Sequence, residues 1–286
     1  MLLYELKKSI KSLTAVLIVI LVTMEIYASG ITDNKTVNNI AVINEDKVAT
    51  YSQPIFRPTD GTVYGKISDT SVIKKVKLNG NEKYMCLTFD SAYNGSYTYN
   101  ILDILDAYGV KATFFMTGEF IKNHPTQVID ILSRGHEIGN HSTTHKDFTK
   151  ISTASIIEEV TECNNNFKEI TGMDMCLFRF PYGYYGSRQL KLVRELGYFP
   201  IQWTADSSDW KNESVEAILA RFENQYFYKP GNILLFHNGA MFTTGALPKI
   251  IEDIQAKGIK LVRVSDMIYK DNFYIDFDGV QKLKEE

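Results

Sequence analysis

Cysteines and clustered basic residues are scarce in this sequence. It holds 3 cysteines in 286 residues, Cys86, Cys163 and Cys176, and no C-x-x-C pair. A zinc or redox centre built from thiolates is therefore not expected, and we interpret the cysteines as mostly buried thiols. The formal net charge is -3 and the pI is about 6.0, and no run of basic residues alternates with aromatics. Because nucleic-acid binding needs such a basic footprint, nucleic acid is not an expected partner.

Two common catalytic or cofactor motifs are also missing. No G-x-G-x-x-G follows the first expected strand, so a dinucleotide site has no support. His136-Glu137 begins like the H-E-x-x-H motif of zinc peptidases, but the next histidine, His141, comes one position too late and Gly139 intervenes. The zinc-peptidase motif is therefore not met.

An apolar run near the N-terminus indicates export. Lys7, Lys8 and Lys11 precede the run 13–24, and small residues follow it at 28–30. The run is shorter than the roughly 20 residues that span a bilayer as a helix. We expect residues 1–30 to be a signal peptide or a membrane anchor; the pattern favours cleavage, and both stay open. The protein is then secreted, or held on the outer face of the cytoplasmic membrane through this segment, facing the cell wall.

The remaining composition predicts one main globular domain. Hydrophobic residues make up 44% of the chain and charged residues 23%, which suffices for one sizeable core. Residues 31–80 are polar and without sustained periodicity, so we expect a linker with one short hairpin around 62–76. The main domain is expected over 81–271, followed by a C-terminal tail over 272–286.

From residue 83 onward, short apolar runs alternate with amphipathic stretches. The expected strand and helix pairs are 84–89 and 98–108, 112–116 and 125–134, 136–138 and 151–170, 177–180 and 187–196, 199–203 and 214–224, 232–236 and 246–256, and 260–262 and 264–269. Repeated β-α units predict an α/β fold with a parallel sheet. The length favours a distorted, incomplete (β/α) barrel of about seven units, since a full eight-fold barrel typically needs about 250 residues. A doubly wound sheet is the alternative.

Several residues with catalytic or metal-binding chemistry follow these expected strands. Asp90 ends the first strand, Arg179 lies at the end of another, and His237 follows the strand 232–236. His141 and His145 are four residues apart and can bind one divalent cation through their imidazole nitrogens, although this spacing also occurs by chance. Because catalytic residues gather at the carboxyl ends of parallel strands, the set suggests metal-assisted hydrolysis.

Five segments in order resemble the polysaccharide deacetylase family, the NodB homology domain of carbohydrate esterase family 4. They are 88–91 (Thr-Phe-Asp-Ser), 141–145 (His-Ser-Thr-Thr-His), 179–183 (Arg-Phe-Pro-Tyr-Gly), 206–210 (Asp-Ser-Ser-Asp-Trp) and 235–237 (Leu-Phe-His). The resemblance covers about residues 80–270 and implies the NodB-type distorted barrel. The opening Thr-Phe-Asp-x-x-Tyr is most similar to the bacterial branch that acts on peptidoglycan, including muramic-acid deacetylases.

The resemblance implies a metal and a base. A divalent cation, with zinc favoured and cobalt or another first-row ion possible, would be held by His141, His145 and Ser91, and would polarise the acetamide carbonyl and activate water. Asp90 would be the general base. Arg179 would orient Asp90 and hold it ionised.

The same resemblance implies an acid and a substrate pocket. His237 would protonate the leaving amine, with Asp206 orienting and charging its imidazole. The backbone N–H of Tyr182 would stabilise the oxyanion. Trp210 and Leu235 would form the apolar wall that receives the acetyl methyl group.

Two positions depart from the family pattern. Ser91 stands where the family commonly has a second aspartate as third metal ligand, so we expect a weaker and exchangeable metal site. Asp147 is a less suitable substitute ligand. Lys146 stands where the family often has proline, which would alter how His145 is presented.

The expected function is thus an exported, metal-dependent hydrolase that removes N-acetyl groups from peptidoglycan or a related N-acetylated cell-wall polysaccharide. An O-acetyl polysaccharide esterase is one alternative. A non-catalytic glycan-binding domain with a degraded metal site is the other, and exposed aromatics would serve either class by stacking on sugar rings. The candidate aromatics are Tyr93, Tyr97, Tyr182, Tyr184, Tyr185 and Trp210.

Overall fold

The computed structural model describes residues 71–284, except 93, 224 and 225. The expected signal peptide or anchor and the linker up to residue 70 therefore lie outside the described residues. Within the described part of the chain, no helix has the length and apolar character needed to cross a membrane.

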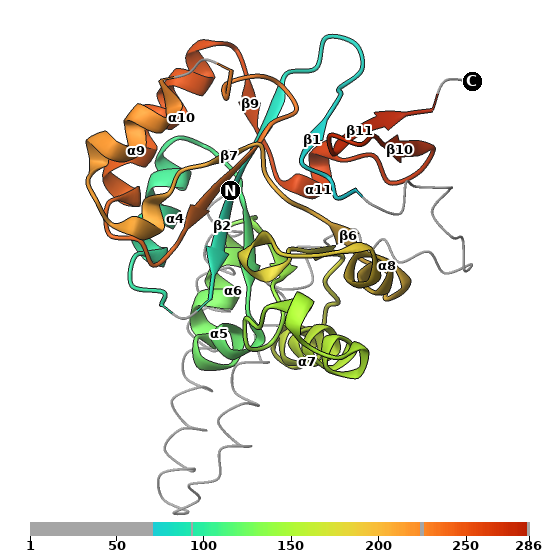
Figure 1. Cartoon of the computed structure of the whole chain (residues 1–286). Helices are drawn as coiled ribbons and strands as arrows, with labels where there is room; N and C mark the ends of the chain where they lie inside the picture. Colours follow the sequence, from blue (N-terminus) through green and yellow to red (C-terminus); the bar gives the residue numbers. More distant parts are fainter. Residues whose placement is uncertain (1–70, 93, 224–225, 285–286) are drawn as a thin grey trace, which may run out of the picture. The chain divides into compact units, whose positions relative to one another are not determined.

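The core of the fold is an all-parallel sheet with the strand order β6-β5-β4-β3-β2-β8-β7 (Figure 1). A further strand, β9, pairs in parallel with the start of β2. The strands are β2 (Tyr84–Ser91), β3 (Thr113–Met116), β4 (Glu137–Asn140), β5 (Leu177–Phe178), β6 (Phe199–Pro200), β7 (Ala205–Asp206), β8 (Ile233–His237) and β9 (Lys260–Leu261). This half-barrel confirms the predicted incomplete (β/α) barrel and excludes the doubly wound alternative.

Helices cover the sheet in two groups, which are joined by a contact between α4 and α6. In one, α10 contacts α4 and α9, and in the other, α7 contacts α5, α6 and α8 (Figure 1). The helices are α4 (Thr98–Ala107), α5 (Gly118–Asn123), α6 (Pro125–Ser133), α7 (Thr153–Thr171), α8 (Ser187–Glu195), α9 (Val215–Phe222), α10 (Thr243–Ala256) and α11 (Val264–Met267). Single-turn 3₁₀ helices lie at η1 (Phe148–Lys150), η2 (Pro181–Gly183) and η3 (Asp209–Lys211).

The central strand shows why the apolar runs predicted strands so well. From Met85 to Ser91 every residue of β2 is buried, because β3 and β8 flank it and helices cover the sheet. Parallel strands buried on both faces read as nearly continuous apolar runs. Cys86 lies inside this run, and Cys163 is also buried while Cys176 is half-buried, which agrees with the interpretation of the cysteines as buried thiols.

A second, three-stranded sheet joins the two ends of the described chain. Its order is β1-β11-β10, formed by β1 (Lys75–Val76), β11 (Val280–Leu283) and β10 (Phe273–Ile275). β1 pairs with β11 in parallel, and most of the hairpin expected around 62–76 lies outside the described residues. The folded part therefore extends beyond the predicted limits of 81 and 271. Strands this short carry no periodicity that a sequence pattern could reveal.

Gly231 anchors β1 to the main sheet. Its N–H donates to Tyr84 O and its carbonyl accepts from Val76 N. Its φ is +87°, and a Cβ here would clash with the carbonyl oxygen of Val76. Replacing Gly231 by alanine is therefore expected to lower the free energy of unfolding by about 3 kcal/mol, measured by urea unfolding. Gly80→Ala is the matched control, because Gly80 also has positive φ (+66°) but no atom within 4 Å of that Cβ. Equal losses in the two variants would contradict the proposed clash.

Candidate active site

Asp90 lies buried at the carboxyl end of the central strand. β2 places it beside Phe115 of β3 on one side and His237 of β8 on the other. Arg179 Nη1 donates to Asp90 Oδ1 at 2.7 Å. Burial raises the pKa of Asp90, but the charges of Arg179 and the neighbouring histidines, with the hydrogen bond from Arg179, bring it below its usual range. Asp90 is therefore ionised at neutral pH.

Arg179 is fully buried and fixed on several sides. Its Nη1 also donates to Thr88 Oγ1 at 2.9 Å, and its Nη2 donates to Gln202 O at 3.2 Å. The guanidinium carbon lies 4.0 Å from the ring centroid of Phe115 and 5.5 Å from that of Trp203. The structure thus places this arginine on Asp90 as the family resemblance implies.

The two histidines of the 141–145 segment lie together. Their ring centroids are 4.8 Å apart. His141 Nδ1 is 2.8 Å from Arg179 O, and because a carbonyl only accepts, Nδ1 carries the proton and Nε2 keeps its lone pair. Nε2 lies 3.5 Å from Asp90 Oδ2. Burial lowers the pKa of His141 and brings that of His145 to about 3, so both rings are neutral at pH 7 and suited to ligate a cation.

Ser91 adds a hydroxyl beside this group. It is fully buried, and its Oγ has no hydrogen-bond partner among the described residues. Two neutral imidazoles and a buried, unsatisfied hydroxyl are donor atoms of the kind that a first-row divalent ion accepts. Within the described chain, however, no three His, Cys, Asp or Glu side chains are arranged to hold a metal. The donor atoms are therefore of the types that bind a divalent metal, but none of them is an anion. The metal site stays a prediction.

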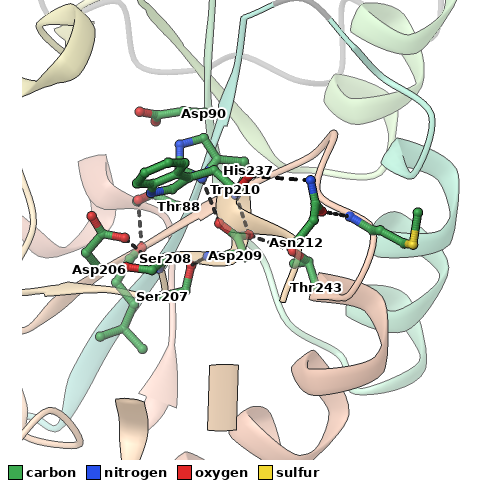
Figure 2. A network of polar contacts seen from close by, with 12 residues as sticks. Thr88, Asp90, Asp206, Ser207, Ser208, Asp209, Trp210, Asn212, His237 and Thr243 are labelled. Carbon is green, nitrogen blue, oxygen red and sulfur yellow. Dashed lines mark hydrogen bonds and ion pairs between the residues drawn. The ribbon is translucent and has the colours of Figure 1, made fainter. Parts of the chain in front are cut away.

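The carboxylate that contacts His237 is Asp209, and the expectation of Asp206 is corrected. His237 Nδ1 lies 2.7 Å from Asp209 Oδ1. Asp206 ends β7 and accepts a hydrogen bond from Ser208 N at 2.7 Å. Figure 2 shows Asp209 beside His237 and Asp206 next to Ser208. Both aspartates stand in the segment 206–210, but spacing alone did not indicate which one faces His237.

Asp209 is itself held by several donors. Its Oδ2 accepts from the backbone N–H of His237 at 2.8 Å and from Thr243 Oγ1 at 2.6 Å (Figure 2). Asp209 N donates to Ser207 Oγ at 3.2 Å. Thr243 begins α10 and was not predicted as a site residue, because a lone threonine at a helix start has no sequence signal beyond capping.

Asp209 also sets the charge of His237. Burial lowers the pKa of this histidine, but the hydrogen bond to Asp209 and its charge, aided by Asp90 and Asp206, raise it above the ordinary value. With Nδ1 bonded to a carboxylate, Nε2 is the nitrogen left to exchange a proton with a substrate.

The predicted substrate-binding residues differ in their exposure to solvent. Tyr182 lies in the 3₁₀ helix η2 and adopts positive φ (59°). The residue is 56% exposed, and its ring centroid lies 4.5 Å from that of His145. Trp210 is also 56% exposed, whereas Leu235 is buried in β8.

The other candidate aromatics differ in exposure. Tyr184 is exposed, with its ring centroid 5.9 Å from that of Tyr182. Tyr97 and Tyr185 are partly buried and pack against the hydrophobic core. Tyr93 lies outside the described residues.

Much of the chain that forms this site matches a family model, and several known proteins are similar to it. Residues 77–201 match the family model described as polysaccharide deacetylase. A peptidoglycan-N-acetylglucosamine deacetylase of Bacillus cereus is 34% identical over 67% of this chain and 91% of its own length. The peptidoglycan-N-acetylmuramic acid deacetylase PdaA of Bacillus subtilis is 32% identical over 67% of this chain and 74% of its own length.

Solved structures of similar proteins include both active and inactive members. BA3943 of Bacillus anthracis, described as a CE4 family pseudoenzyme, aligns with a TM-score of 0.62 at 27% identity over 71% of this chain and 70% of that chain. A mutant of BA3943 described as having restored enzymatic activity aligns with the same TM-score at 30% identity, over 65% of this chain and 68% of that chain.

Proposed function

The chain belongs to the polysaccharide deacetylase family, and from this premise we propose that it is an exported, metal-dependent hydrolase that removes N-acetyl groups from cell-wall glycan. Peptidoglycan is the substrate we favour, because the similar proteins of Bacillus cereus and Bacillus subtilis are peptidoglycan deacetylases. One observation supports the proposed catalytic mechanism. Asp90 and His237 are register partners on adjacent strands, and Arg179 and Asp209 drive them toward opposite protonation states.

Asp90 is suited to act as the general base. It is ionised because Arg179 holds its pKa below the usual range, and its Oδ2 is free of the bond that Arg179 makes to Oδ1. As water attacks the acetamide carbonyl, Asp90 takes the proton that the water loses. A correctly placed base of this kind contributes typically about 10²–10⁴-fold to the rate.

His237 is suited to act as the general acid. Asp209 favours its protonated form, so His237 can give a proton to the departing amine nitrogen while the carbonyl carbon keeps the new oxygen. The products are acetate and a free amine on the sugar. Leu235 and Trp210 remain the proposed apolar wall for the acetyl methyl group.

His141 and His145, with Ser91, are the residues that would hold a divalent ion. When bound, the ion supplies Lewis-acid polarisation of the acetamide carbonyl and lowers the pKa of water. On the protein side, Arg179 O fixes the tautomer of His141 by accepting from Nδ1, and this orients Nε2 as a ligand. The backbone N–H of Tyr182 is the proposed donor to the oxyanion.

The test of this function is acetate release by the full chain. Peptidoglycan, chitin oligomers and an O-acetylated polysaccharide are each incubated with the protein after chelation and after zinc or cobalt is added back. We expect metal-dependent release from the N-acetylated substrates and none from Asp90→Asn. Release from the O-acetylated polysaccharide alone would replace the proposal by the esterase alternative.

A glycan-binding function without catalysis is the second candidate. Two observations favour it: Ser91 lacks the charge of an aspartate ligand, and the similar BA3943 is described as a pseudoenzyme. A pure binder does not need a base, an acid and their charged partners. The presence of Asp90, Arg179, Asp209 and His237, all buried or half-buried, therefore favours the enzyme. Glycan binding with no acetate release under any metal would establish the binder.

Ser91→Asp is expected to tighten metal binding by about tenfold or more, because it adds an anionic oxygen where an unsatisfied hydroxyl now lies. The dissociation constant is measured by competition with a chelating dye. Ser96→Asp serves as control, since it adds the same charge at an exposed position of the neighbouring turn. An equal change in both variants would mean that Ser91 does not face the metal.

A further inference from the structure

Glu159 is a buried carboxylate that the mechanism does not use. It lies within α7 and faces the segment between the two ligand histidines. Its Oε2 accepts from the backbone N–H of Thr143 at 2.9 Å and from that of Thr144 at 2.7 Å. Its Oε1 accepts from Thr144 Oγ1 at 2.6 Å and pairs with Lys146 Nζ at 3.0 Å. One side chain thus binds four donors of a single loop.

The loop that Glu159 binds has an unfavourable backbone. Ser142 and His145 both have positive φ, 68° and 59°, a conformation that non-glycine residues adopt only when the surroundings hold them there. His145 N donates to Ser142 Oγ at 3.0 Å, and Thr143 Oγ1 donates to the backbone carbonyl of Glu159 at 2.8 Å. These contacts hold the 141–145 loop in a shape that brings the two imidazole rings together.

The peptide groups between the histidines need this partner. Thr143 and Thr144 N–H point into a buried region, where a donor without an acceptor is strongly unfavourable. α7 supplies the acceptor through a carboxylate, which makes stronger hydrogen bonds than a neutral group. Lys146, at the position where the family often has proline, joins the same carboxylate. A proline there would have no side-chain donor. In this chain, the ion pair with Glu159 holds the residue after His145.

We propose that Glu159 is a positioning residue that holds His141 and His145 in the geometry required for a divalent cation, with Lys146 as its auxiliary partner. This inference rests on the proposed metal site of the same histidines. Groups that orient metal ligands typically change metal affinity by about 10–100-fold when they are removed.

The experiment measures Co²⁺ binding to the full chain by competition with a chelating dye and by the visible absorption of bound Co²⁺. Glu159→Ala is expected to weaken Co²⁺ binding by about tenfold or more and to alter the absorption band. Glu159→Gln keeps one oxygen for the two backbone N–H groups but loses the charge, so a smaller loss is expected. Glu158→Ala is the matched control, because Glu158 is the adjacent, exposed residue of α7.

The outcomes separate this inference from the function on which it rests. A purely structural role would lower the thermal unfolding temperature of the metal-free protein and leave the affinity of the folded protein unchanged. Equal Co²⁺ affinity in Glu159→Ala and Glu158→Ala overturns the positioning role, and if Glu159→Ala fails to fold, equal affinity in Glu159→Gln and Glu158→Ala does so. Absence of Co²⁺ binding by the unmodified chain overturns the metal site itself, and the positioning role with it.

Discussion

Asp209→Asn is expected to lower kcat for acetate release by about 10²–10⁴-fold, the range that a general acid contributes. The amide oxygen can accept the His237 Nδ1–H bond, but it lacks the negative charge that favours the protonated ring. It would also present N–H to Thr243 or to the backbone N–H of His237, which now donate to Oδ2. The ring would lose both its charge and its orientation. Steady-state kinetics on the metal-loaded enzyme measures the effect.

The control for this prediction is Asp206→Asn, which changes the same charge three residues earlier. Asp206 bonds to Ser208 N and not to the histidine, so we expect a loss of less than about tenfold. The pH profile adds a second readout. Because Asp209 raises the pKa of His237, the acid is protonated to higher pH in the unmodified enzyme. The basic limb of kcat/KM should move to lower pH in Asp209→Asn. A larger loss in Asp206→Asn would return the orienting role to Asp206.

Arg179→Met is expected to lower the free energy of unfolding by about 3–5 kcal/mol, the typical effect of removing one partner of a buried ion pair. Asp90 would remain buried without the guanidinium that now contacts Oδ1. Thr88 Oγ1 and Gln202 O would also lose a donor. Urea unfolding at pH 7 measures the change. Arg188→Met is the control, because Arg188 is exposed and makes hydrogen bonds only at the surface.

The pH dependence of stability tests the cause of that loss. In the unmodified protein, the pKa of Asp90 is lowered by folding, so its contribution is present above the unfolded pKa and is lost as pH falls through the folded pKa. Without Arg179, only the neighbouring histidines oppose the effect of burial, so the pKa of Asp90 should rise and acidification should relieve the unpaired charge. The stability gap between the two proteins should therefore narrow toward acid pH. A constant gap would mean that lost packing around Phe115 and Trp203, and not charge, causes the effect.

The sequence predicted the central sheet well, for a physical reason. Strands such as β2 and β8 are buried on both faces, and this gives continuous apolar runs with abrupt polar ends. β7 and β1 each have 2 residues and α5 has 6, so tertiary contacts define them more than local pattern does. α5 begins at Gly118, a residue that usually weakens a helix, and its start depends on Thr117, whose side chain accepts from Phe120 N.

The candidate site was predictable in its residue types and less so in its contacts. Asp90, Arg179, His141 and His145 lie together, because each lies at or after the carboxyl end of a strand and the strands are parallel. The partner of His237 was not predictable from spacing, since the turn at Ser208 has positive φ (53°) and redirects the chain. Such a turn brings Asp209 inward and leaves Asp206 bonded to the turn itself.

The pairing of β1 with β11 determines how this protein can be cut for study. Lys75 and Val76 align with Val280 and Gln281, and Ile73 and Lys75 also bridge to residues beside β6 and β8. A fragment that starts at 81 or stops at 271 would remove one half of this pairing and expose the edge of the other half to the solvent, where unpaired strands associate with one another. A soluble fragment for crystallisation should therefore begin before Ser71 and end after Leu283, so that it contains both β1 and β11.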